Sequence, residues 1–297
     1  MYLNNNFIIY YMHPLYYVEN TSNKNQEQIN GVEYNDPNYY PNFQIDIDWL
    51  KNILIEKNKN NEGYVVMRVY DGEFHFLNKK VVGNGPNRHY SKPLTNEFIK
   101  PFLEGCYQVD ILSCQLNINM LKQFHIIIPN PKPKFLPMDI IYGLFANKWI
   151  LSTFKNKIAL IGGNEKMKVI QELMKYEEYQ KYVCNDYFTD YIDVPERFSC
   201  DNTDTLIEDI GTKIKNSNAE VFLFGIGISK MAMAYKFKNY KDAIFIDIGC
   251  GMSGLAGTVE TDRPYFGCWN NYRIKTYDYS KIDPTNFNIS RDNVHFL

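Results

Sequence analysis

Short apolar runs that end in glycine turns recur along the second half of the chain. KIALIGG at 157–163 ends in two glycines and is followed by a helical pattern over 165–181. EVFLFGIG at 220–227 and AIFIDIGCG at 243–251 repeat the same sequence of an apolar run and a glycine turn. Repeated strand, glycine turn and helix are typical of a doubly wound sheet. The pattern therefore predicts an α/β, Rossmann-like fold with a mostly parallel sheet.

The first half of the chain adds elements of the same kinds. By their apolar spacing, the expected elements are helices at 45–59, 94–106 and 138–154 and strands at 64–70 and 109–116. Residues 1–45 are rich in Asn and Tyr and are expected to form an irregular arm, with a disordered tail as the alternative. We expect one domain over 46–262, and a loop-rich tail over 263–297 that packs on it.

Composition and charge narrow the function classes. The chain of 297 residues carries 32 basic and 34 acidic residues, a net charge of −2, so no global positive field indicates nucleic-acid binding. Six cysteines without a CxxC pair indicate reduced thiols rather than zinc ligands. No apolar run is long enough to span a membrane, and heavy use of Asn, Lys, Ile and Tyr favours AT-rich codons. We expect a cytoplasmic protein, in the host cytoplasm if the source is viral.

The stretch IFIDIGCGMSG at 244–254 is similar to the cofactor loop of S-adenosylmethionine-dependent methyltransferases. In that fold, roughly 120 further residues of alternating helices and strands follow the loop. Here only 43 residues follow Gly254, and they show no such alternation. The stretch is therefore expected to be the last core strand of the sheet, with Asp247 either contacting a ribose or capping the turn. A methyltransferase is kept as an alternative.

A second group of polar residues lies in MRVYDGEFHFL at 67–77. If the strand continues through this segment, Asp71 and Glu73 project to the same side and can hold one divalent cation. Mg²⁺ or Mn²⁺ held by two carboxylates is a common partner of a diphosphate. Arg68 would neutralise phosphate there or form a salt bridge at the sheet edge. The alternative is a hairpin turn at Asp71-Gly72 with both carboxylates in solvent.

Three segments, in order, resemble the GT-D type of glycosyltransferase. MRVYDGEFHFL is similar to the R-x-GDGE segment of that family, with Tyr70 at a position where glycine is common. GNGPNRHYS at 83–91 is similar to a substrate-side loop of some members, and 219–257 is similar to the closing strand–helix–strand unit with its DIG turn. Some members have histidine after this turn, where the present chain has Cys250. The resemblance covers about 45–260.

This resemblance implies transfer of a sugar from a nucleotide diphosphate sugar, expected to be a UDP-sugar, to a glycan or protein acceptor. It implies Mn²⁺ or Mg²⁺ bound by Asp71 and Glu73. A nucleotide-sugar-binding protein without turnover, built on the same scaffold, is a further alternative. The sequence leaves a homodimer open.

Other residues receive roles on this interpretation. Arg88 and His89 would contact phosphate or an acceptor hydroxyl, with an exposed loop as the alternative. His89 is also a candidate catalytic base, together with Glu260 and Asp262. Lys230 would reach a phosphate unless it is a solvated surface lysine. Four glycines would bring backbone N–H groups to the nucleotide: Gly162, Gly163, Gly225 and Gly227.

Overall fold

The fold is known from a computed structural model. It describes residues 43–80, 89–114, 123–124, 126–128, 133–258, 266, 269–282 and 294–297. Residues 1–42 of the predicted arm and three predicted site residues, Arg88, Glu260 and Asp262, lie outside the described residues. Residues 43–45, which were also expected to belong to the irregular arm, instead begin helix α4 (Phe43–Lys59). Among the described helices, none combines the length and apolar character needed to cross a bilayer.

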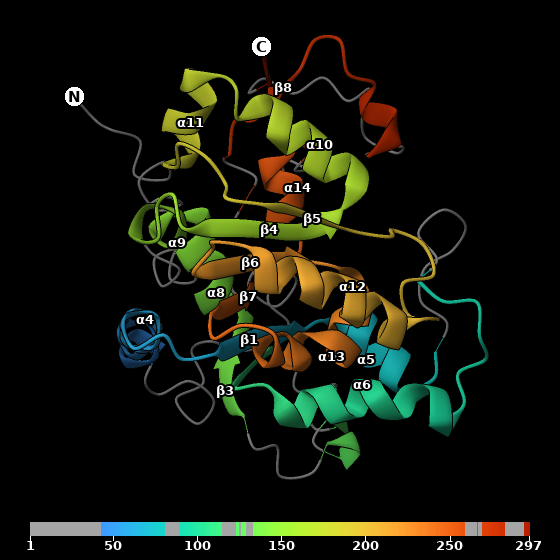
Figure 1. The fold of residues 1–297 in the computed structure, drawn as a ribbon. Helices are drawn as coiled ribbons and strands as arrows, with labels where there is room; N and C mark the ends of the chain where they lie inside the picture. Colours follow the sequence, from blue (N-terminus) through green and yellow to red (C-terminus); the bar gives the residue numbers. More distant parts are fainter. Residues whose placement is uncertain are drawn as a thin grey trace, which may run out of the picture.

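A parallel sheet of seven strands forms the centre of the fold (Figure 1). The strand order is β3-β2-β1-β7-β6-β4-β5, and every neighbouring pair is parallel. The strands are β1 (Tyr64–Val69), β2 (Ile111–Cys114), β3 (Lys134–Pro137), β4 (Ile158–Gly163), β5 (Tyr191–Val194), β6 (Val221–Gly225) and β7 (Ile244–Asp247). The predicted Rossmann-like α/β class is confirmed, and β7 is the last strand of this sheet in chain order.

Helices cover both faces of the sheet, which explains why its central strands read as continuous apolar runs. Val66 of β1 faces one core together with α4 (Phe43–Lys59), α8 (Met138–Ala146), α9 (Trp149–Thr153), α10 (Asn164–Leu173), α11 (Glu177–Val183) and α14 (Gly251–Leu255). Val65 and Met67 face the other core with α5 (Asp71–Leu77), α6 (Asn96–Gln108), α12 (Thr203–Asn216), α13 (Lys230–Met233) and the 3₁₀ turns η2 (Gly227–Ser229) and η3 (Ala234–Asn239).

Two predicted helices are interrupted. The helix expected over 138–154 is divided into α8 and α9, because Lys148 adopts a left-handed conformation with φ of 65°. Its ammonium lies 3.5 Å from the centre of the Tyr182 ring, which stabilises the break. The pattern over 165–181 is likewise divided into α10 and α11. Helix periodicity therefore identified the element type but missed both breaks.

The described part of the C-terminal tail packs on the sheet domain. Trp269 is buried, and its indole N–H donates a hydrogen bond of 2.9 Å to the carbonyl of Ala146. Two short parallel strands, β8 (Asn271–Arg273) and β9 (Val294–Phe296), form a second small sheet beside the turn η4 (Tyr279–Lys281). This packing closes the core that contains α8 and α14.

The connections of the large sheet diverge on either side of β7 and β6. After β1 the chain crosses the face that carries α5 and α6, whereas after β4 it crosses the opposite face with α10 and α11. Strands β7 and β6 lie between these two diverging connections. In open α/β sheets, ligands bind beyond the carboxyl ends of the strands at such a point. The turns after β1, β4, β6 and β7 all lie at this edge.

Candidate functional site

The segment with Asp71 and Glu73 is the start of a helix rather than the end of a strand. Strand β1 ends at Val69, and α5 begins at Asp71 with Tyr70 as its N-cap. The amide of Tyr70 donates to Glu73 Oε2 at 2.9 Å, which satisfies a helix-start N–H with the side chain of the third helical residue. Successive helical residues rotate by about 100°, so residues two apart diverge. The prediction that both carboxylates project to one side is therefore wrong.

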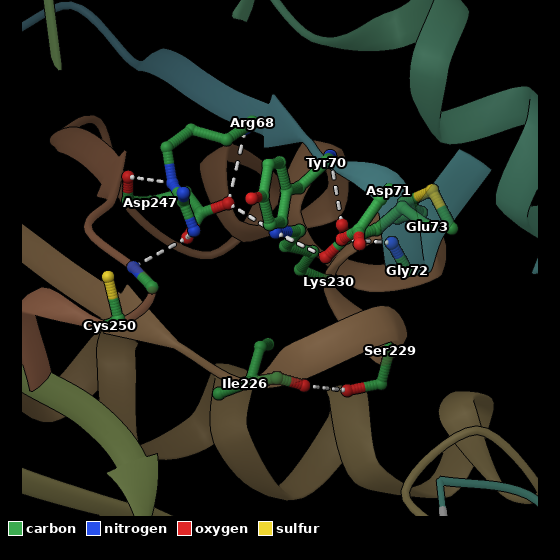
Figure 2. A network of polar contacts seen from close by, with 12 residues as sticks. Arg68, Tyr70, Asp71, Gly72, Glu73, Ile226, Ser229, Lys230, Asp247 and Cys250 are labelled. Carbon is green, nitrogen blue, oxygen red and sulfur yellow. Dashed lines mark hydrogen bonds and ion pairs between the residues drawn. The ribbon is translucent and has the colours of Figure 1, made fainter. Parts of the chain in front are cut away.

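Asp71 and Glu73 have different surroundings (Figure 2). Asp71 is exposed, and its Oδ1 accepts a hydrogen bond of 2.7 Å from the amide of Gly72. Glu73 is buried, and its Oε1 lies 2.7 Å from the ammonium nitrogen of Lys230. Of the two carboxylates, only that of Asp71 is accessible to a ligand.

Lys230 bridges two buried carboxylates. Besides Glu73, its Nζ lies 2.7 Å from Oδ2 of Asp247, at the end of β7. The lysine side chain is 2% exposed. Two roles were predicted for Lys230, a solvated surface lysine and a side chain that reaches a phosphate. The buried ammonium, held between two carboxylates, has neither role. It joins the start of α5 to the end of β7.

Asp247 caps the turn after β7, one of its two expected roles. Its Oδ2 accepts the Arg68 amide at 3.1 Å, and its Oδ1 accepts the Gly249 amide at 3.0 Å. The Arg68 guanidinium forms a salt bridge of 3.3 Å with Oδ1, and its Nε donates to the Asp247 carbonyl. Gly249 has φ of 42°, and a Cβ there would overlap the guanidinium, so glycine is required. The fully buried carboxylate is not presented to a ribose.

Arg68, Glu73, Lys230 and Asp247, here called the charge cluster, balance two positive against two negative charges. All four residues are buried. Burial alone would raise the pKa of Glu73, but the charge and hydrogen bond of Lys230, the charge of Arg68 and the Tyr70 amide together outweigh it and hold this pKa at about 2. Glu73 is therefore ionised at neutral pH.

The lowered pKa of Glu73 predicts acid-dependent stability. Because the folded-state pKa lies below the unfolded value of 4.5, the contribution is fully present above pH 4.5 and is lost as pH falls towards 2. The whole effect is about 3 kcal/mol of unfolding free energy. Denaturant unfolding of wild type and Glu73→Gln between pH 6 and 3 measures the part of this effect that is lost above pH 3, with exposed Glu177→Gln as the matched control. Equal pH slopes for wild type and Glu73→Gln would contradict the assignment.

His89 lies next to the charge cluster, which influences its pKa. Its ring packs against Gly227, where a Cβ would lie 2.7 Å from the imidazole Cε1 and where φ is 60°. Its carbonyl accepts a hydrogen bond of 3.0 Å from the Cys200 amide. The neighbouring residue Ser91 donates its amide to Asp201 at 2.9 Å. The loop before α6 is thus tied to the loop after β5, and it holds the imidazole over the turn after β6.

The protonation state of His89 suits a base. Burial lowers its pKa from 6.5, and the negative charge of Glu73 opposes this only in part, while Lys230 adds to the lowering. The imidazole is therefore neutral at pH 7. Its Nδ1 is buried and has no hydrogen-bond partner among the described residues. Because Nδ1 is buried, a substrate hydroxyl could pass its proton only to Nε2 of this neutral imidazole.

The four predicted glycines all lie at the carboxyl edge and pack closely. A Cβ on Gly225 would lie 2.9 Å from the Gly249 carbonyl, so the turns after β6 and β7 touch there. A Cβ on Gly163 would overlap the Glu196 carboxylate, and one on Gly162 would lie 3.0 Å from the end of Met167. The backbone contact explains the glycine at 225, whereas the neighbours of Gly162 and Gly163 are ends of flexible side chains. Whether their amides hold a nucleotide stays a prediction.

Tyr142 and Lys166 at this edge were not anticipated from the sequence. The Arg68 guanidinium lies 4.3 Å from the centre of the Tyr142 ring, and the Tyr142 hydroxyl accepts a hydrogen bond of 3.0 Å from the Cys250 thiol. Lys166, in the first turn of α10, lies with its Nζ 3.2 Å from the Ser253 hydroxyl of α14. The position of Lys166 after a strand and two glycines is a signal that could have identified it. No local pattern distinguishes Tyr142, which reaches the site from α8.

The contacts of the charge cluster determine whether its carboxylates can bind the expected metal ion. Glu73 has an N–H donor on each carboxylate oxygen, and so has Asp247. In Asp71, the Gly72 amide bonds to Oδ1 and not to Oδ2. In the described part of the chain, no group of three or more His, Cys, Asp or Glu side chains is arranged to hold a metal ion. Asp71 and Glu73 thus do not fit a divalent cation as a ligand pair.

Comparison with known proteins adds no family assignment. No model of a known protein family matches the chain, and no curated protein matches it with significant similarity. The geometry of the carboxyl edge and the resemblance of the motifs therefore carry the functional argument.

Proposed function

We propose that the chain is a glycosyltransferase that moves a sugar from a nucleotide diphosphate sugar, expected to be a UDP-sugar, to a hydroxyl of a glycan or protein. The observation that carries the proposal is the neutral imidazole of His89 beside the charge cluster at the switch point of the sheet. The resemblance of MRVYDGEF and of the DIG turn to GT-D glycosyltransferases supports the same reaction class.

The proposed chemistry assigns a task to each accessible group. His89 accepts the proton of the acceptor hydroxyl as its oxygen bonds to the anomeric carbon of the donor. The bond from that carbon to the diphosphate breaks, and the nucleotide diphosphate leaves with the electron pair. In this proposal, Lys166, whose Nζ contacts Ser253, and the N–H groups at the start of α10 hold the diphosphate. The exposed carboxylate of Asp71 accepts a hydrogen bond from a sugar hydroxyl.

A donor screen tests the proposal. Purified protein is incubated with a panel of nucleotide sugars, with and without Mn²⁺, and released nucleotide diphosphate is measured by mass spectrometry. We expect slow hydrolysis of one donor, because water can replace the acceptor. Asp209 is exposed on α12, where it pairs with Lys213. The variant Asp209→Asn serves as the control and should hydrolyse the donor at the wild-type rate.

The other outcomes distinguish the alternatives. Binding of a nucleotide sugar without turnover, in the presence of acceptor extracts, would favour the non-catalytic binding protein. Binding of S-adenosylmethionine, with no nucleotide sugar bound, would favour the methyltransferase. In that case Asp247 would have to leave its contacts with Arg68 and Lys230 in order to hold the ribose.

A further inference from the structure

The ammonium of Lys230 occupies the position that a bridging cation would take. Two carboxylates from separate elements, Glu73 of α5 and Asp247 of β7, each direct one oxygen at Nζ, and both distances are 2.7 Å. Figure 2 shows Lys230 between them. Two carboxylate oxygens converging on one point are the usual protein contribution to a magnesium or manganese site. Here a lysine provides the positive charge.

The remaining contacts leave no place for a second cation at Glu73. Its other oxygen accepts the Tyr70 amide, and the oxygens of Asp247 accept the amides of Arg68 and Gly249. The charge cluster is already balanced, and all of it is buried. A divalent ion added there would lie beside two fixed positive charges in a region of low dielectric, where like charges repel strongly.

We propose that Lys230 is a built-in replacement for a divalent cation, so that the site works without a metal held by Glu73. This departs from the metal-binding pair that the sequence resemblance implies. The inference deepens the proposed function and rests on it for the identity of the substrate. Its first test, however, needs no substrate.

That test measures Mn²⁺ binding by electron paramagnetic resonance and by the shift of the melting temperature. Wild type should show no saturable Mn²⁺ site that depends on Glu73. Lys230→Ala removes the ammonium and leaves two carboxylates facing a cavity, so it should bind Mn²⁺ at least tenfold more tightly than wild type, and Mn²⁺ should raise its melting temperature. Lys230→Ala/Glu73→Gln should lose this gain. Lys236→Ala, which removes a lysine paired with the exposed Asp204, is the matched control and should show none.

Two results would overturn the proposal. One is a Mn²⁺ site in wild type that Glu73→Gln abolishes, a measurement that remains decisive if Lys230→Ala does not fold. The other is donor turnover that stops with chelator, returns with Mn²⁺ and loses this Mn²⁺ dependence in Glu73→Gln, which would refute the built-in cation and leave glycosyl transfer standing. If no donor is turned over under any condition, the proposed function fails, and Mn²⁺ binding to wild type and Glu73→Gln still decides the role of Lys230.

Discussion

Asp247→Ala is expected to lower the free energy of unfolding by about 3–5 kcal/mol, because it leaves two buried cations without their shared partner. Asp247 is fully buried and is bonded to Arg68, Lys230 and the amide of Gly249. Its loss removes the negative charge between both cations and also uncaps the turn after β7. Urea unfolding at pH 7 measures the change.

Asp209→Ala is the matched control for this loss. Asp209 pairs with Lys213 at 2.8 Å, but both side chains are exposed on α12, so the variant should change stability by no more than about 0.5 kcal/mol. Asp247→Asn, which keeps the shape and one acceptor oxygen, should fall between the two. A loss for Asp247→Ala as small as that for Asp209→Ala would contradict the described charge cluster.

His89→Ala is expected to lower kcat/KM by about 10²–10⁴-fold, the usual contribution of a general base. The same role predicts the direction of the pH dependence. The imidazole must be neutral to accept a proton, and its pKa lies below 6.5, so wild-type activity should be constant around pH 7 and fall as pH decreases through that lowered pKa. Steady-state rates between pH 5 and 8 measure both effects.

His75 provides the control for His89. It lies on α5, is partly buried, and likewise has a buried Nδ1 without a hydrogen-bond partner among the described residues. His75→Ala should leave kcat/KM within a few-fold of wild type and keep the pH profile. A His89→Ala enzyme that retains both the wild-type rate and the fall at low pH would remove His89 from the proposed mechanism.

The fold could be predicted from the sequence because its signals are local. Each core strand is a short apolar run, and the predicted turns after β4, β6 and β7 carry glycines where neighbouring turns or side chains pack closely. The helix breaks were missed because nothing local marks Lys148 as left-handed. Its conformation is accompanied by contacts with Tyr182 and Trp269, which come from other parts of the chain.

The site was harder to predict for two physical reasons. In the segment YDGE, the Glu73 side chain accepts a hydrogen bond from the Tyr70 amide, and a helix starts there. The prediction assumed that a strand continued through this segment, so it was wrong about where the side chains of Asp71 and Glu73 point. The charge cluster joins Arg68 to Asp247 across 179 positions. Arg68 and Asp247 are therefore too far apart to belong to one local motif. Nothing in the sequence around Lys230 distinguishes it from an exposed lysine.

We propose that a nucleotide sugar binds at the carboxyl edge of β1, β4, β6 and β7. Hydrogen–deuterium exchange with and without a panel of nucleotide sugars tests it most directly. A polar cavity of about 290 Å³ lies at the opposite end of the sheet and includes Lys57, Glu220 and Lys241 in its lining. We expect ligand-dependent protection in peptides that contain 70–73, 163–166, 225–230 and 247–251, and none around this polar cavity. Protection confined to the polar cavity, or no protection by any nucleotide sugar, would contradict the proposed function.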